Sequence, residues 1–229
     1  MKDRVLIYSG KTKDLYDIGG GVYQLYFRDE MTGEDGVFDP GSNSVGLTME
    51  GAGIAGLGMS SYYFKLLNEK GCATHFIESD VSARTMNIKP VTRFGEGLEI
   101  VCRYVAMGSF VKRYGSIVKS GIALPAVVEV TLKDDARGDP LINKDSLVAL
   151  GILNPGEDEV LVDLTKRICG IIREDLFCKG LELCDIKLEF GRDSHGTVML
   201  IDEISAGNMR VRKDGEVVQP LELAGMVGG

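Results

Sequence analysis

The chain is poor in the residues that commonly carry catalysis or cross-linking. It has two histidines and five cysteines among 229 residues. His75 and His195 do not stand near a serine or cysteine in a triad arrangement, so we do not expect histidine-based catalysis. The cysteines are odd in number and include no C-x-x-C pair, which argues against a disulfide framework or a zinc ribbon. We expect them to be small buried hydrophobes or inert thiols.

Positive charge and long apolar runs are also scarce. Lys and Arg number 26 against 34 Asp and Glu, which gives a net charge of −8. Nonspecific binding to nucleic acid depends on clustered Lys and Arg, so we expect no nucleic-acid partner. Uninterrupted apolar runs stay well short of a membrane span, and "MKDRVLIYSG" has no signal-peptide core. We therefore expect a cytoplasmic protein without a membrane partner.

What is present is a regular alternation that predicts strands. The segments "RVLIYSG", "KTKDLYDI" and "VYQLYFRDE" predict short strands joined by glycine-rich turns. "CATHFIES", "TMNIKPVTR" and "LEIVCRYVAMG" predict further strands, and "ELCDIKLEFG" with "TVMLIDEIS" predicts a hairpin across "RDSHG". Strands with helices inserted between antiparallel pairs indicate an α+β fold.

Helices are predicted at two places. Helix-spaced apolar residues over 58–69 are followed by Gly71, and 158–179 has early acids, later bases and Gly180 as a stop. Residues 31–58 are rich in Gly, Ser, Asp and Asn without sustained periodicity, which predicts a long ordered loop. The tail from Lys213 predicts no more than a short strand.

Charged and apolar side chains alternate in "DIKLEFG". Successive side chains of a strand point to opposite faces, so Asp185, Lys187 and Glu189 share one face. On the second strand of the hairpin, Asp202 continues an otherwise apolar face that includes Leu200. Glu189 and Asp202 offer hard oxygen ligands, a pair suited to Mg²⁺ that bridges phosphate oxygens. A solvated charged face is the alternative.

Two basic groups are candidates for anion binding. Lys11 and Lys13 share a strand face in "SGKTKDLYD", so two ammonium groups could reach a polyphosphate, although the Walker A spacing is absent. Arg103 stands near the Gly108-Ser109 turn, which could bind a phosphate or a carboxylate. Lysines that protect an edge strand, and a basic surface rim, are the respective alternatives.

Taken in order, six segments resemble the SAICAR synthetase family, the phosphoribosylaminoimidazole-succinocarboxamide synthases of purine biosynthesis. The segments are "SGKTKDLYD", "FRDEMTGEDG", "AMGSFVKRYG", "LKDDARGDPLIN", "DIKLEFG" and "IDEIS...R", and they span residues 9 to about 210. The resemblance implies two lobes with antiparallel sheets and an ATP cleft between them. We expect an ATP-binding lobe over 1–97 and a C-terminal α+β lobe with substrate and metal residues over 98–229.

The resemblance implies an ATP- and Mg²⁺-dependent ligase. Such an enzyme phosphorylates the carboxylate of carboxyaminoimidazole ribonucleotide and lets the amine of L-aspartate displace the phosphate, which needs a phosphate cradle and a guided amine. Its partners would be small molecules, and we expect a homo-oligomer. Two alternatives stay open: a paralogue that joins a different acid or amine, and a nucleotide-binding protein without turnover.

The resemblance also assigns roles to residues of this chain. The ATP residues are Lys11, Lys13, Glu189 and Asp202, of which the last two also hold the metal. The substrate residues are Arg103, Ser109, Lys133, Asp139 and Arg210. The catalytic residues are Lys187, Asp185 and Asp35, with Asp185 holding Lys187 in place.

Departures from the family pattern concern the substrate side. Gly207 stands where the family has an aspartate, Tyr104 and Val105 replace an asparagine and an arginine, and the stretch after Gly36 lacks a basic residue. The tail lacks the closing helix and its K-D-x-x-R. One lost charge-assisted contact costs about 1.5 to 3 kcal/mol, so these losses bear on which acid and amine the protein joins.

Overall fold

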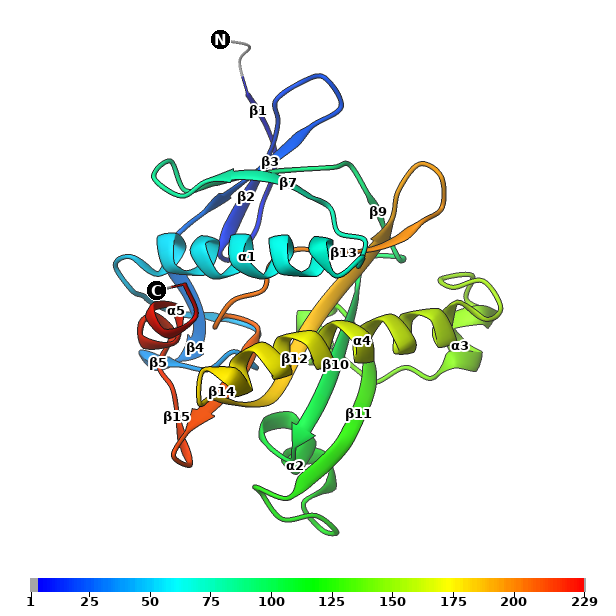
Figure 1. Ribbon diagram of the computed structural model, residues 1–229. Coiled ribbons are helices and arrows are strands. Elements are labelled where there is room, and N and C mark those ends of the chain that lie inside the picture. The colour runs from blue at the N-terminus through cyan, green and yellow to red at the C-terminus, as the bar shows by residue number, and fades with distance from the viewer. Residues whose placement is uncertain (1–3, 229) are drawn as a thin grey trace.

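The computed structural model describes residues 4–228 and has the predicted α+β architecture (Figure 1). Three antiparallel sheets are present, and helices pack against the two larger ones. No helix of the described part is long and apolar enough to cross a membrane.

The first sheet has the strand order β1-β2-β3-β8-β7 and confirms the strands predicted near the N-terminus. Its strands are β1 Val5–Ser9, β2 Lys13–Asp17, β3 Tyr23–Phe27, β7 Phe76–Asp80 and β8 Thr85–Ile88. Helix α1, Ala52–Glu69, buries Leu57, Phe64 and Leu67 against this sheet. The Phe64 ring stacks on Phe76 of β7 at 5.6 Å between centroids. The hydrophobic effect thus fixes α1 under the sheet.

The second sheet has the order β11-β10-β12-β14-β15, and β9 and β13 also pair with β12. Its strands are β9 Thr92–Arg93, β10 Leu98–Val105, β11 Ala123–Leu132, β12 Glu182–Arg192, β13 Val198–Ile201, β14 Met209–Lys213 and β15 Glu216–Val217. The hairpin β12–β13 is as predicted. Helix α4, Glu157–Cys178, confirms the second predicted helix and packs its buried apolar residues on one face of the sheet. The opposite face is left for polar side chains.

Residues 31–58 are not the loop that their composition predicts. They contain β4 Glu30–Glu34, β5 Val37–Phe38, β6 Val45–Thr48 and the start of α1, six residues before the predicted one. The strands approach so closely that a Cβ on Gly46 would lie 2.3 Å from the carbonyl carbon of Gly33. The glycines therefore allow the strands to approach closely, and the spacing of apolar residues does not reveal such a role.

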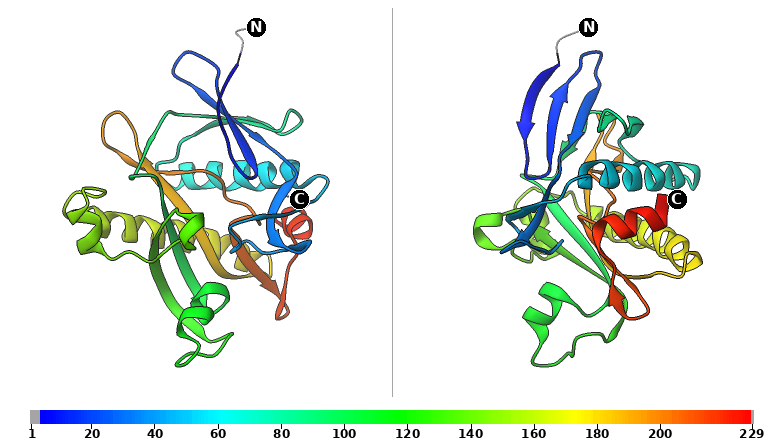
Figure 2. Two further views of the ribbon diagram at one scale, coloured as in Figure 1. Left: turned by 180° about the vertical axis from the view of Figure 1, so that it is seen from behind. Right: turned by 90° about the vertical axis from the view of Figure 1, so that its left-hand side faces the viewer.

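The tail also departs from the prediction, because it ends in a helix. Helix α5, Pro220–Gly228, packs against α1 with Leu223 and Val227 buried (Figure 2). Proline is preorganised for the first turn of a helix, and the two buried residues are spaced i, i+4 on one face. The helix carries no Lys or Arg.

Short helices connect the strands of the second sheet. They are α2 Gly108–Tyr114, a 3-10 turn Asp135–Arg137 and α3 Lys144–Ala149. Several contacts cross the boundary expected between residues 97 and 98: β9 pairs with β12, Thr74 pairs with Leu200, and α5 packs on α1. The two sheets are therefore joined by backbone pairing as well as by side chains.

Candidate active site

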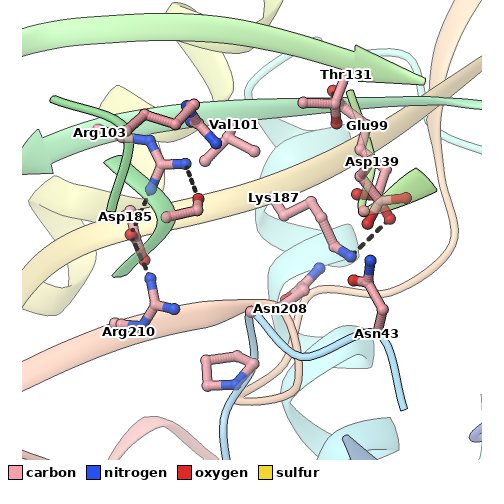
Figure 3. A pocket seen from close by; sticks show the side chains of 15 residues that line it. Asn43, Glu99, Val101, Arg103, Thr131, Asp139, Asp185, Lys187, Asn208 and Arg210 are labelled. Atoms are coloured by element: carbon pink, nitrogen blue, oxygen red, sulfur yellow. Dashed lines mark hydrogen bonds and ion pairs between the residues drawn. The ribbon is translucent and has the colours of Figure 1, made fainter. Parts of the chain in front are cut away.

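A polar pocket lies over the face of β10 and β12 that α4 leaves free (Figure 3). The two strands pair with Glu99 opposite Glu189, Val101 opposite Lys187 and Arg103 opposite Asp185. Because strand side chains alternate, these six project to one side, while Ile186, Leu188 and Phe190 enter the core. The shared face predicted for Asp185, Lys187 and Glu189 is therefore confirmed.

Arg103 is the buried centre of the pocket, with only 3% of its surface exposed. Its Nε donates to Glu129 at 2.7 Å, Nη1 to Asp185 at 3.0 Å and Nη2 to the Ser109 hydroxyl at 2.9 Å. Ser109 lies on α2, so the structure brings together two of the predicted substrate residues. A buried guanidinium with three acceptors is held in one orientation, which suits recognition of an oxyanion.

Asp185 and Lys187 have different partners from the expected pair. Asp185 Oδ2 accepts from Arg103 and, at 2.7 Å, from Nη1 of Arg210, whereas the Lys187 ammonium pairs with Glu99 at 2.6 Å. The difference follows from the strand pairing, since Asp185 lies across from Arg103, whereas Lys187 lies across from Val101 and diagonal to Glu99. Burial raises the pKa of Asp185, although both guanidiniums oppose that shift.

A second cluster of charged side chains lies where the two large sheets meet. Lys13 of β2 pairs with Asp202 at 3.1 Å and also with Glu203, and Lys133 pairs with Glu189. Burial would lower the pKa of Lys13, but Asp202 and Glu203 raise it above its usual range. The cluster thus joins the N-terminal sheet to the end of β13.

The two acids proposed for the metal are electrostatically coupled. Burial and then the charge of Asp202 raise the pKa of Glu189. Burial would also raise the pKa of Asp202, but Lys13 and Lys133 lower it to about 2. Glu189 is buried and the Asp202 side chain is 29% exposed, and neighbouring carboxylates of this kind are stabilised by a cation between or beside them. The pair therefore fits Mg²⁺.

Glu189 and Asp202 would supply only part of the ligands that Mg²⁺ needs. Residues 4–228 hold no group of three or more His, Cys, Asp or Glu side chains arranged as a complete metal site. Mg²⁺ is commonly bound by one or two carboxylates, with phosphate oxygens and water as the other ligands. The donor set of Glu189 and Asp202 matches that mode, in which the nucleotide completes the coordination.

Asp202 does not continue the apolar face of β13 as the alternation predicts. The strand ends at Ile201, and Asp202 has φ of +67°, in the left-handed region. This turn takes its carboxylate out of the alternation and toward Lys13, while Leu200 stays in the core. Its carbonyl oxygen lies 3.2 Å from Nε2 of the buried His75.

The remaining predicted residues are more scattered. Lys11 lies in the turn before β2 and pairs with Asp135 at 2.6 Å, so it does not share a strand face with Lys13. Asp139 lines the pocket, and its Oδ1 accepts from the Asp134 backbone at 2.8 Å. Lys133 belongs to the charged cluster around Glu189 and not to the pocket lining.

Asp35 lies on the exposed β4–β5 turn, outside the pocket lining. Asp39, four residues later, is the acid of this region that reaches the site, because its Oδ1 accepts from Nη2 of Arg210 at 3.0 Å. Arg210 itself lies on β14 and lines the pocket.

Several site residues escaped the sequence prediction. They are Asp39, Asn43, Glu99, Glu129, Glu203 and Asn208. Glu99 could have been found, since it precedes Arg103 by four residues on a predicted strand and so shares its face. Asn43 and Asn208 come from separate loops and face Lys187 only in the folded chain (Figure 3).

Comparison with protein families and curated sequences gives one consistent result. A family model described as SAICAR synthetase matches residues 6–219. A Clostridium tetani protein named phosphoribosylaminoimidazole-succinocarboxamide synthase is 55% identical over 97% of this chain and 98% of its own length. A Thermotoga maritima protein of the same name is 36% identical over 92% of this chain and 86% of its own.

Solved structures agree with the sequence matches. A phosphoribosylaminoimidazole-succinocarboxamide synthase from Ehrlichia chaffeensis has a TM-score of 0.82 and 28% identity, covering 93% of this chain and 87% of its own. A structure described as SAICAR synthetase (Type-2) in complex with ADP has a TM-score of 0.80 and 30% identity, covering 92% and 86%.

Proposed function

The chain belongs to the SAICAR synthetase family, and we propose that it is the ATP-dependent ligase that joins the carboxylate of carboxyaminoimidazole ribonucleotide to L-aspartate in purine biosynthesis. The observation that carries the proposal is the 55% identity to the Clostridium tetani synthase over nearly the whole of both chains. The pocket and the adjoining charged cluster provide the two kinds of site that such a reaction needs.

The nucleotide belongs at the charged cluster. Lys13 and Lys11 would bind its phosphates, with Glu189 and Asp202 holding Mg²⁺ beside them. A bound Mg²⁺ would neutralise phosphate charge at this position. The related structure in complex with ADP supports nucleotide binding, and the position is supported by Glu189 and Asp202, whose charges act on each other's protonation.

The ribonucleotide belongs in the pocket. Arg103, Ser109 and Arg210 would bind its anionic groups, with Asp139 also in the pocket lining and Lys133 beside Glu189 in the adjoining charged cluster. Lys187 lies between this pocket and Glu189, so its ammonium can stabilise charge that develops on the transferring phosphate. Asp185 would act by orienting Arg103 and Arg210. Asp35 lies outside the pocket lining, and Asp39 of the same region would act by holding Arg210, which its Oδ1 contacts.

The proposed chemistry has two steps. A carboxylate oxygen of the ribonucleotide attacks the γ-phosphorus of ATP, and ADP leaves, which gives an acyl phosphate. The aspartate amine then attacks the acyl carbon, and inorganic phosphate leaves as the nitrogen gives up a proton. Incubation with ATP, Mg²⁺, the ribonucleotide and aspartate should yield the succinocarboxamide by mass spectrometry. Failure to form it under conditions where ADP binds would contradict the specific reaction.

A paralogous ligase with another acid or amine is the second candidate, because of Gly207. A Cβ at this position would lie 3.1 Å from the Ser205 hydroxyl and 3.8 Å from Glu203. An aspartate side chain here would thus approach the Glu203 carboxylate, so this corner of the site differs from the family pattern. Release of ADP with a panel of acids and amines would separate the two candidates.

We further propose that residues 1–97 form an ATP-binding lobe and that residues 98–229 form a substrate-binding lobe. Lys13 in the first sheet and the pocket residues on the second sheet support it, while loop 39–44 of the first lobe adds one wall of the pocket. Homo-oligomeric state and a cytoplasmic location stay predictions, which light scattering and cell fractionation would test.

A further inference from the structure

The Arg210 guanidinium lies in a narrow slot and is held by two carboxylates. Nη1 donates to Asp185 at 2.7 Å, and Nη2 donates to Asp39 at 3.0 Å. Gly41 and Gly108 flank it so closely that a Cβ on either would lie 2.5 or 2.6 Å from a guanidinium nitrogen. The slot therefore fixes where the cation is presented to the pocket.

The two carboxylates differ in how easily they can leave. The Asp185 side chain is 5% exposed and also binds Arg103, so its removal would leave two largely buried cations without this counter-charge. The Asp39 side chain is 45% exposed and can return to water. Partial burial would raise the pKa of Asp39, but the Gly41 amide and Arg210 lower it, so this carboxylate is charged at neutral pH. Asp39 is thus the exchangeable partner.

Asp39 opens a loop, residues 39–44, that forms one wall of the pocket (Figure 3). Within residues 4–228, the other hydrogen bonds of loop 39–44 go to Thr32 and Gly33 of β4 or stay inside the loop. The contact between Asp39 and Arg210 is therefore the hydrogen bond that fastens this wall to β14.

We infer that Asp39 is a displaceable counter-ion of Arg210, which holds the guanidinium and loop 39–44 in place until an oxyanion of the acceptor substrate takes its position. The inference rests on the proposed function for the identity of that oxyanion, a phosphate or carboxylate of the ribonucleotide. Two anions repel one another at a single guanidinium edge, so binding of the ligand releases Asp39. Asp39 is in this way a specificity-determining residue that sets the affinity for the anion.

The variant Asp39→Asn tests the competition directly. It keeps an Oδ1 acceptor for the Gly41 amide, which donates to Asp39 at 2.8 Å, but removes the competing charge. Calorimetry with inorganic phosphate, without ATP, should show binding tightened about two- to fivefold, the range expected for a half-exposed ion pair. The matched control Glu34→Gln removes one charge from an exposed position on β4 and should leave phosphate binding unchanged.

A second measurement uses turnover. Asp39→Asn should lower the KM for the ribonucleotide by a similar factor and leave the KM for ATP unchanged, since Asp39 contacts Arg210 and not the charged cluster. In an Arg210→Gln background, Asp39→Asn should have no effect on phosphate binding. Weaker or unchanged phosphate binding by Asp39→Asn alone would overturn the inference. Tighter phosphate binding without turnover of the ribonucleotide would uphold it and contradict the proposed reaction instead.

Discussion

At the scale of single residues, the charged cluster depends on acids that pair with lysines. Glu189→Gln or Asp202→Asn removes one carboxylate and leaves Lys133 or Lys13 without that partner. We expect turnover to fall at least about a hundredfold and the Mg²⁺ concentration for half-maximal activity to rise, because a metal ligand is lost. ADP release titrated with Mg²⁺ measures both, with circular dichroism to establish that the fold is intact. Unchanged activity in both variants would refute the metal assignment.

Arg103 has a structural and a functional role at once. Arg103→Ala should raise the KM for the anionic substrate more than the KM for ATP. It should also cost about 1.5 to 3 kcal/mol of stability, because the buried Glu129 and Asp185 would lose their shared cation and keep only Arg113 and Arg210, respectively.

The pH dependence of the stability lost in Arg103→Ala follows from the direction in which the pKa of Asp185 is shifted. The pKa of Asp185 is already raised, and without Arg103 it would rise further, so the folded variant takes up a proton more readily than the unfolded chain. The stability that Arg103→Ala loses relative to the unchanged protein should therefore become smaller as the pH falls. It should become larger as the pH rises through the pKa of Asp185 in the variant. Urea unfolding at several pH values measures it, and a deficit that is independent of pH would contradict the explanation.

At the scale of secondary-structure elements, helix α5 shows how a glycine-rich tail can be structural. Leu223 is 1% exposed and faces α1, whereas Leu221, two residues earlier, is 43% exposed. Leu223→Ala should cost about 2 to 5 kcal/mol, as for other buried leucines. Leu221→Ala should change stability by no more than about 0.5 kcal/mol. Urea unfolding of the two variants makes the comparison, and equal effects would mean that α5 does not pack as described.

At the scale of the whole molecule, the charged cluster links the two large sheets, so a ligand bound there should stabilise the entire fold. ADP with Mg²⁺ at about a hundred times its Kd should add about 2.7 kcal/mol to the free energy of unfolding. Lys13→Gln should remove most of that gain, because Lys13 is the β2 side chain of the cluster. The exposed Lys119→Gln is the control and should keep it. An equal gain in both variants, measured by thermal unfolding, would place the nucleotide elsewhere.

The sequence by itself determined which strands and helices carry a clear period. β12 and β10 alternate, and α4 has a regular apolar stripe with acids first, so local physics already decides their form and which faces they bury. The same alternation placed Asp185, Lys187 and Glu189 on one face, and six ordered motifs indicated the family.

Only the tertiary structure decided the elements and contacts that depend on distant neighbours. β4, β6 and α5 contain glycines, β5 is only two residues long, and all four elements are stabilised by packing against other segments, which no local pattern encodes. The partners of Lys187, Arg210 and Asp202 were also undecided, because a side chain that can reach several opposite charges takes the one that the fold brings near. Asp39 belongs to the site for the same reason, because the fold brings loop 39–44 to β14, where Asp39 contacts Arg210.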